Sequence, residues 1–287
     1  MSVRIITDSA SDLPASVIKE FGITVMPLMV SLDGQEYEDE VTIHSKDMLD
    51  GMRSGKIYKT SQVPIETFQH TFQSIAEQGE EAVYIAFSSE LSGTYASSIM
   101  VLDMVREDHP SLQCDIINTK CASLGTGLVV HQAALWAKEG MGREELVRKI
   151  TQLAQNMEHI FTVDDLEYLY RGGRVSKTSA FIGGLLNIKP VLNVEDGKLI
   201  PLEKVRGRKK SIQRMAELFG ERGNTSDKDQ LIAISHGDDM EAVDSLKTML
   251  SEQYGMKNFM VNTIGCAVGS HSGPGTLALF FYNKQYQ

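Results

Sequence analysis

The chain has 287 residues, with 28 Lys or Arg against 38 Asp or Glu, so its formal net charge is −10. This acidic balance excludes the overall basic surface that binds nucleic acid or anionic lipid through counterion release. The length reaches the range in which single hydrophobic cores stop growing, which favours two domains.

The three cysteines show neither the Cys-x-x-Cys spacing of a zinc site nor an even-numbered disulfide framework. We therefore expect reduced thiols and no metal ion. Residues 1–8 lead straight into a strand pattern, without the apolar run of a signal peptide or a membrane span. These features predict a cytoplasmic protein that does not insert into membranes.

The first half of the chain alternates short apolar runs with amphipathic stretches. Strand patterns occupy residues 3–7, 24–32, 82–87, 113–118 and 159–163. Helical patterns occupy residues 14–21, 65–78, 94–107 and 123–138. This alternation is typical of βαβ units, so it predicts a Rossmann-like domain whose mainly parallel sheet is covered on both faces.

The second half has a different pattern. Strand patterns at residues 189–194 and 199–206 flank Asp196 and Gly197, a two-residue hairpin signal. Helices are expected near residues 211–221 and 240–254, and strands at residues 230–235, 259–263 and 276–282. We therefore predict an α/β fold of two domains, with a parallel sheet in residues 1–159 and a mixed sheet in residues 160–287.

Residues 269–276 carry the strongest chemical signal. They place His271 between Ser270 and Ser272 and end in a Gly-Pro-Gly turn, directly before the apolar residues 277–282. Hydroxyl and imidazole groups are thereby held at the edge of an apolar compartment. Such an arrangement suits an amphiphile with a polar head and an apolar body.

Three other segments place hydroxyl groups at the ends of predicted elements. Thr7, Asp8 and Ser9 follow the first strand, Thr60 and Ser61 precede the helix at residues 65–78, and Ser92 precedes the helix at residues 94–107. In each segment the polar groups either cap a helix or contact a ligand. The residues alone leave both interpretations open.

A serine hydrolase of lipids or thioesters is the alternative from another functional class, with Ser92 as nucleophile and His271 as base. Residues 90–94 lack the first glycine of a Gly-x-Ser-x-Gly nucleophile elbow. Such a pair also needs a carboxylate that orients the histidine, and the sequence alone cannot place one. A phosphotransferase acting alone ranks below both functions, because no nucleotide-binding motif is present.

Two basic clusters interrupt the acidic chain. One contains Arg171 and Arg174, and the other spans residues 204–210 and includes Arg206. They are either solvated ends of helices or, if they converge, a local site for a phosphate group or a docking partner.

Together these segments resemble the DegV family of bacterial fatty-acid-binding proteins. The resemblance covers nearly the whole chain in the same order. Its motifs are Thr7-Asp8-Ser9, Thr60-Ser61-Gln62, Leu91-Ser92-Gly93-Thr94-Tyr95, Gly172-Gly173-Arg174, Lys189-Pro190, Arg206-Gly207 and His271-Ser272-Gly273-Pro274-Gly275-Thr276. Departures are small, since Val63 stands where proline is usual and Ser272 replaces a common threonine.

The resemblance implies a lipid-binding carrier, not an enzyme, that encloses one long-chain fatty acid between two domains and needs no cofactor. Carried over by motif, Thr60, Ser92 and His271 bind the carboxyl group. Additional residues at the edge of the pocket are Ser61, Gly93, Thr94 and Ser272. The resemblance also implies a dihydroxyacetone-kinase-like partner that converts the acid to acyl phosphate for phospholipid synthesis, with Arg174 and Arg206 facing the partner or the phosphate.

Overall fold

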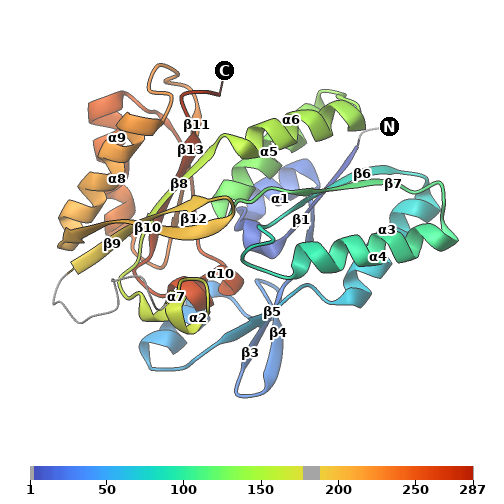
Figure 1. Ribbon diagram of the computed structural model, residues 1–287, viewed down its shortest axis with the longest axis horizontal. Coiled ribbons are helices and arrows are strands. Elements are labelled where there is room, and N and C mark those ends of the chain that lie inside the picture. Colours follow the sequence, from blue (N-terminus) through green and yellow to red (C-terminus); the bar gives the residue numbers. More distant parts are fainter. Residues whose placement is uncertain (1–2, 177–187, 287) are drawn as a thin grey trace.

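The computed structural model describes residues 3–176 and 188–286, which form an α/β fold with three sheets (Figure 1). The first sheet is parallel, in the order β2-β1-β6-β7. Its strands are β1 (Arg4–Asp8), β2 (Thr24–Met26), β6 (Glu81–Ala86) and β7 (Gln113–Asn118). The parallel sheet predicted for the first half of the chain is confirmed.

The second sheet is mixed, in the order β10-β9-β8-β13-β11-β12. Its strands are β8 (Met157–Thr162), β9 (Ile188–Glu195), β10 (Lys198–Arg206), β11 (Leu231–His236), β12 (Asn258–Thr263) and β13 (Leu277–Tyr282). Only β11 and β12 run parallel among these neighbours. Asp196 and Gly197 both have positive φ between β9 and β10, as a two-residue hairpin turn requires. The mixed sheet is confirmed.

Helices cover both large sheets, and one of them lies between the sheets. Helix α5 (Leu124–Lys138) is apolar around most of its circumference, so it packs against residues of both sheets, such as Val83 and Ala278. Helix α6 (Arg143–Gln155) packs beside α5, and α1 (Ala15–Phe21) also contacts α5. The face of the parallel sheet that points away from α5 is covered by α3 (Ile65–Gln78) and α4 (Thr94–Asp108). The face of the mixed sheet that points away from α5 is covered by α8 (Arg208–Arg222) and α9 (Met240–Tyr254) (Figure 1).

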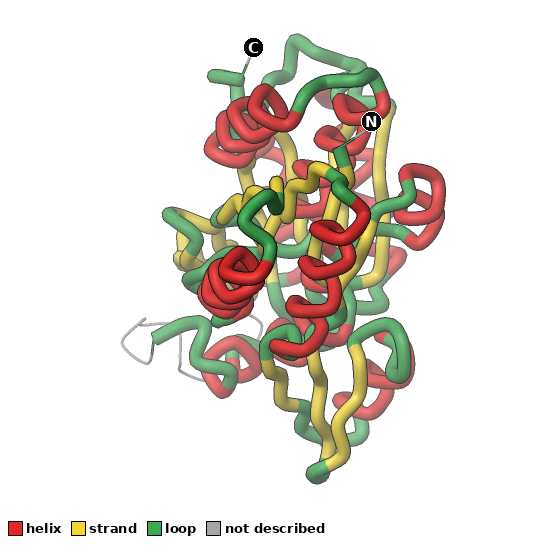
Figure 2. The backbone as a smooth tube through the Cα atoms, turned by 90° about the vertical axis from the view of Figure 1, so that its right-hand side faces the viewer, coloured by secondary structure: helices red, strands yellow, loops and turns green. Residues whose placement is uncertain are grey.

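A third, small sheet projects from one end of the molecule (Figure 2). It consists of β3 (Met29–Leu32), β4 (Gln35–Glu38) and β5 (Lys59–Ser61), antiparallel in the order β4-β3-β5. The remaining helices are η1 (Ser9–Ser11), α2 (Ser45–Arg53), α7 (Glu167–Arg171) and α10 (Cys266–Ser272). In the described part of the chain, no helix has the length and apolarity needed to cross a bilayer.

Three segments differ from what the sequence predicts. Residues 24–32 form two strands in different sheets, because Pro27 between them has no N–H to continue a ladder. The strand predicted at residues 159–163 is β8, which does not extend the parallel sheet but runs antiparallel to β9 and β13. Residues 269–272, which precede the predicted Gly-Pro-Gly turn and were not predicted to be helical, are the last four residues of α10.

Candidate functional site

A cavity of about 240 Å³ lies between the carboxyl ends of the parallel strands and one face of the mixed sheet. Ala10, Phe87 and Ala122 line it from the segments that follow β1, β6 and β7. Open parallel sheets bind ligands at this edge. The cavity therefore lies where the topology favours a binding site.

The body of the cavity is mainly apolar because of the two-residue periodicity of β8 and β13. Phe161 and Phe280 line it, with Ala278 directly opposite Phe161 across the two strands. The intervening residues of β13 pack on the other face of the sheet, beneath α8 and α9. The small side chain of Ala278 beside two phenylalanines leaves room between the sheets.

One group of polar side chains forms the polar end of the cavity, whereas Ser123 and His159 also line the cavity but bond to Asp12 and to the Ala122 N–H. Seven of the residues predicted from sequence line it, namely Thr60, Ser61, Ser92, Gly93, Arg174, His271 and Ser272. They come from β5, the loop before α4, the segment after α7 and the last turn of α10. Two predicted site residues do not line the cavity. Thr94 is buried beside Ser92, and Arg206 is exposed at the end of β10.

The hydroxyl and imidazole groups at this end form two separate hydrogen-bonded pairs. Thr60 Oγ1 lies 2.7 Å from His271 Nε2. Ser92 Oγ lies 2.9 Å from Thr94 Oγ1 and accepts the Thr94 N–H at 3.3 Å. Ser272 Oγ is buried and has no hydrogen-bond partner among the described residues. A carboxylate placed here would meet several donors, one of them without a partner.

The same geometry is unfavourable for a serine nucleophile. No hydrogen bond joins Ser92 to His271 in the described structure, since Ser92 is paired with Thr94 and His271 with Thr60. A Ser-His pair also needs a third group that orients the imidazole. At His271 the Nδ1 atom instead faces the backbone of Gly172.

His271 is uncharged at neutral pH. Burial, and secondarily the positive charge of Arg174, lower the pKa of His271 from 6.5 to about 4. Gly172 limits the space around the ring, because a Cβ atom at this position would lie 2.2 Å from His271 Nδ1. The φ of Gly172 is −72°, so glycine is needed here for space and not for backbone conformation.

Arg174 joins two segments of the polar end. Its Nε and Nη2 atoms donate to the Leu91 carbonyl at 3.2 and 2.9 Å, and Nη1 donates to the Gly172 carbonyl. Ser92 follows Leu91 directly, so the guanidinium group holds the Ser92 loop against the Gly172 segment. Arg174 and Arg206, which were predicted to share one role, therefore lie in different environments.

Buried carboxylates hold the start of α10, a feature that sequence reasoning missed. Asp12 Oδ1 accepts the Gly265 N–H at 2.9 Å, and Asp39 Oδ1 accepts the Cys266 N–H at 2.7 Å. Burial raises the pKa of Asp39 to about 6. These contacts fix the helix whose last turn carries His271.

The helix-capping interpretation is wrong for Asp8 and Thr60, whereas Ser92 Oγ accepts the N–H of Thr94, the first residue of α4. Helix α3 begins after Pro64 without a side-chain cap, and Thr60 belongs to β5. Asp8 caps no helix and does not line the cavity. Its Oδ2 atom accepts the Tyr84 hydroxyl at 2.8 Å and the Phe87 N–H at 3.0 Å, which ties β1 to the end of β6.

The cysteine thiols are poorly suited to bind metal ions. Burial raises the pKa of both Cys114 and Cys121 to about 12, so neither thiol ionises at neutral pH. Among the described residues, one group of potential ligands lies close together, formed by Asp39, Glu40 and Cys266. Both oxygens of Asp39 already accept hydrogen bonds, from Ser9 Oγ at 2.7 Å and from the Cys266 N–H at 2.7 Å.

Comparison with known proteins finds matches along nearly the full length of the chain. A family model described as an uncharacterised protein of the DegV family matches residues 2–284. A DegV domain-containing protein from Clostridium perfringens is 39% identical over 280 residues, which cover 96% of each chain.

Solved structures with the same fold include proteins described as fatty-acid-binding. A DegV family protein from Thermus thermophilus, described by its fatty acid binding, has a TM-score of 0.88 at 30% identity and covers 99% of this chain and 100% of its own. A stearic-acid-binding protein from Eubacterium ventriosum also has a TM-score of 0.88, at 27% identity and 98% coverage of both chains.

Proposed function

The chain belongs to the DegV family, and from this premise we propose that it binds one long-chain fatty acid and acts as a carrier. The acyl chain occupies the apolar body of the cavity, and the carboxyl group binds at Thr60, Ser92 and His271. The observation that carries the proposal is the arrangement of hydroxyl and imidazole groups at one end of an otherwise mainly apolar cavity. Relatives described as binding fatty acids support it.

The acyl chain supplies most of the affinity. Burying roughly 14 to 16 methylene groups at about 0.8 kcal/mol each gives a gross gain on the order of 10 kcal/mol. After the costs of association, this suffices for micromolar or tighter binding. The aromatic and aliphatic lining between the two sheets is the surface on which that gain depends.

The polar end supplies orientation. A buried carboxylate without partners costs several kcal/mol, so it requires donors. Thr60, Ser92 and Ser272 provide hydroxyl groups, and the nearby Arg174 provides a positive charge that is already held by backbone carbonyls. Because the hydroxyls are neutral and Arg174 is occupied, the carboxylate oxygens remain available for reaction.

We further propose that the bound acid is presented to a dihydroxyacetone-kinase-like partner that forms acyl phosphate for phospholipid synthesis. Ser61 and Gly93, at the polar end of the cavity, are exposed, so a carboxyl group there would lie near the protein surface. Arg206 is exposed and does not line the cavity, whereas Arg174 does. Arg206 is therefore a better candidate than Arg174 for contact with the partner or the transferred phosphate.

Titration with palmitate and with methyl palmitate tests the binding proposal. Palmitate should saturate at one molecule per chain, and the ester should bind more weakly because it carries no charge. Ser92→Ala should weaken palmitate binding by roughly 1 to 3 kcal/mol, since it removes one donor. Ser89→Ala is the matched control, because its hydroxyl lies in the same loop but accepts from Asn118 Nδ2 and does not line the cavity.

Two outcomes would contradict the carrier. Equal affinity for acid and ester in the wild-type protein would mean that no carboxylate site exists. Turnover of the ester, lost in Ser92→Ala and accompanied by labelling of Ser92 with a covalent serine probe, would assign a hydrolase instead.

A further inference from the structure

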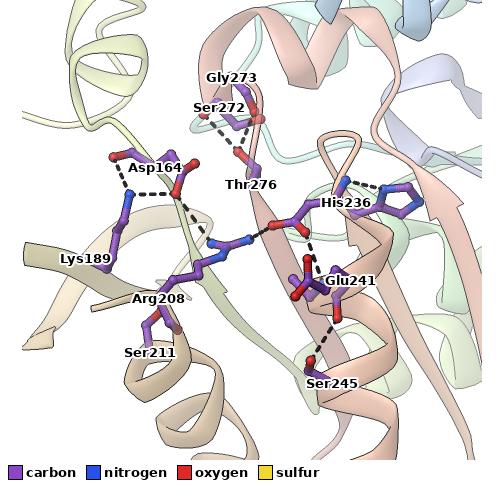
Figure 3. Close-up of polar contacts among 12 residues, drawn as sticks. Asp164, Lys189, Arg208, Ser211, His236, Glu241, Ser245, Ser272, Gly273 and Thr276 are labelled. Carbon is purple, nitrogen blue, oxygen red and sulfur yellow. Dashed lines mark hydrogen bonds and ion pairs between the residues drawn. The ribbon is translucent and has the colours of Figure 1, made fainter. Parts of the chain in front are cut away.

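Arg208, at the start of α8, makes ionic contacts with two loops that flank the carboxylate end of the cavity (Figure 3). Its Nη2 atom donates to Asp239 Oδ2 at 2.6 Å, in the loop between β11 and α9. Its Nη1 atom lies 3.9 Å from Asp164 Oδ1, in the segment after β8. Lys189 Nζ contacts the same Asp164 oxygen at 2.7 Å. Arg208 therefore connects segments that are far apart in the sequence.

The loop that contains Asp239 is bonded to the turn that follows His271. The Gly237 N–H donates to the Thr276 carbonyl at 2.8 Å, and the Gly275 N–H donates to the Gly237 carbonyl at 2.8 Å. The two segments are in close contact, because a Cβ atom at Gly237 would lie 2.7 Å from the Gly273 carbonyl oxygen. A shift of this loop would move the turn with it.

Asp164 lies against the opposite side of the turn. A Cβ atom at Gly275 would lie 2.2 Å from Asp164 Oδ2, so no side chain fits between them. Within the turn, the single Thr276 hydroxyl donor is shared between the carbonyls of Ser272 and Gly273, which lie 2.9 and 2.8 Å from Oγ1 (Figure 3). The turn that follows His271 and Ser272 therefore lies between the Asp164 segment and the Gly237 loop.

We propose that Arg208 is a positioning residue for the fatty-acid carboxylate, acting through Asp164 and Asp239 on the turn that orients His271 and Ser272. Arg208 does not line the cavity, so its effect is transmitted through these two loops. The planar guanidinium group can contact two carboxylates at once, whereas a lysine ammonium group at the same place would serve mainly one. This inference rests on the proposed function of the same cavity.

The chain offers a matched control on the same helix. Arg214 also lies on α8, its side chain is 23% exposed like that of Arg208, and it is bound by Glu203, Glu217 and Glu221. Arg208→Ala should weaken palmitate binding about threefold to thirtyfold, the range for residues that act on a site indirectly. Arg214→Ala should remain within about twofold of the wild-type protein, because the three glutamates lie on β10 and α8 and not in the loops beside the turn.

An NMR titration of His271 separates positioning from general stability. In the ligand-free wild-type protein the His271 ring should stay neutral until about pH 4. Its signals and titration midpoint should shift in Arg208→Ala but not in Arg214→Ala. Asp239→Asn, which keeps a good N-cap for α9, should shift them in the same direction as Arg208→Ala, and the double variant should be non-additive.

The outcomes distinguish this inference from the binding proposal. If wild-type protein and Arg214→Ala bind palmitate while Arg208→Ala binds it equally well with unchanged His271 signals, Arg208 has no positioning role. Failure of the wild-type protein to bind palmitate would instead contradict the proposed function itself.

Discussion

Gly172→Ala is expected to bind palmitate roughly tenfold or more weakly than the wild-type protein, with little change in fold. The added methyl group would lie 2.2 Å from His271 Nδ1, so the imidazole ring must move. That movement takes His271 Nε2 away from Thr60 Oγ1, which lies 2.7 Å from it in the wild-type protein. Overpacking of this kind costs about 1 to 3 kcal/mol. The backbone itself tolerates alanine, because φ is −72°.

Gly142→Ala is the matched control for that substitution. Gly142 has the same φ of −72°, and a Cβ atom there would have no neighbour within 4 Å. Palmitate affinity should be measured by titration for both variants, with circular dichroism as a check of folding. Wild-type affinity in Gly172→Ala would mean that the position of His271 does not matter for binding, and the carboxylate site would have to be placed elsewhere.

Arg206→Ala is expected to impair acyl-phosphate formation, and Arg174→Ala is expected to impair palmitate binding. Arg206 is exposed and outside the cavity, so its loss should leave palmitate bound but lower acyl-phosphate formation roughly tenfold or more when a kinase partner, ATP and Mg²⁺ are supplied. Arg174 holds the carbonyls of Leu91 and Gly172 beside the site. Its loss should therefore weaken palmitate binding at least as much as Ser92→Ala.

Two measurements on each variant check this separation, namely bound palmitate after purification and acyl phosphate formed per minute. Full acyl-phosphate formation by Arg206→Ala would leave Arg206 as an ordinary surface charge. Loss of palmitate from Arg206→Ala would place that residue in the binding step instead.

The sequence predicts most of the elements of the fold because their patterns are local. The apolar periodicity of residues 65–78 and 240–254 coincides with α3 and α9, and the Asp196-Gly197 signal coincides with the β9–β10 turn. Strand partners depend on contacts between distant segments, so periodicity cannot assign them. The strand β8 shows this limit, since its pattern fits a parallel or an antiparallel neighbour equally well.

The site shows the same division between local and distant information. Motifs of the DegV family name Thr60, Ser92 and His271, and the structure brings all three to one cavity. Motifs do not reveal that Gly172 limits the space beside His271, that Asp12 and Asp39 hold the start of α10, or that Arg174 lines the cavity while Arg206 does not. Each of these relations joins residues that are far apart in the sequence or depends on the path of a loop.

The central claim is that this chain holds one fatty acid whose carboxyl group lies at Thr60, Ser92 and His271. Native mass spectrometry of the purified protein, followed by organic extraction and identification of the released compound, tests it most directly. We predict one long-chain fatty acid per chain, retained in Ser89→Ala and reduced in Ser92→Ala. A homogeneous ligand-free mass that does not change when palmitate is added would contradict the claim.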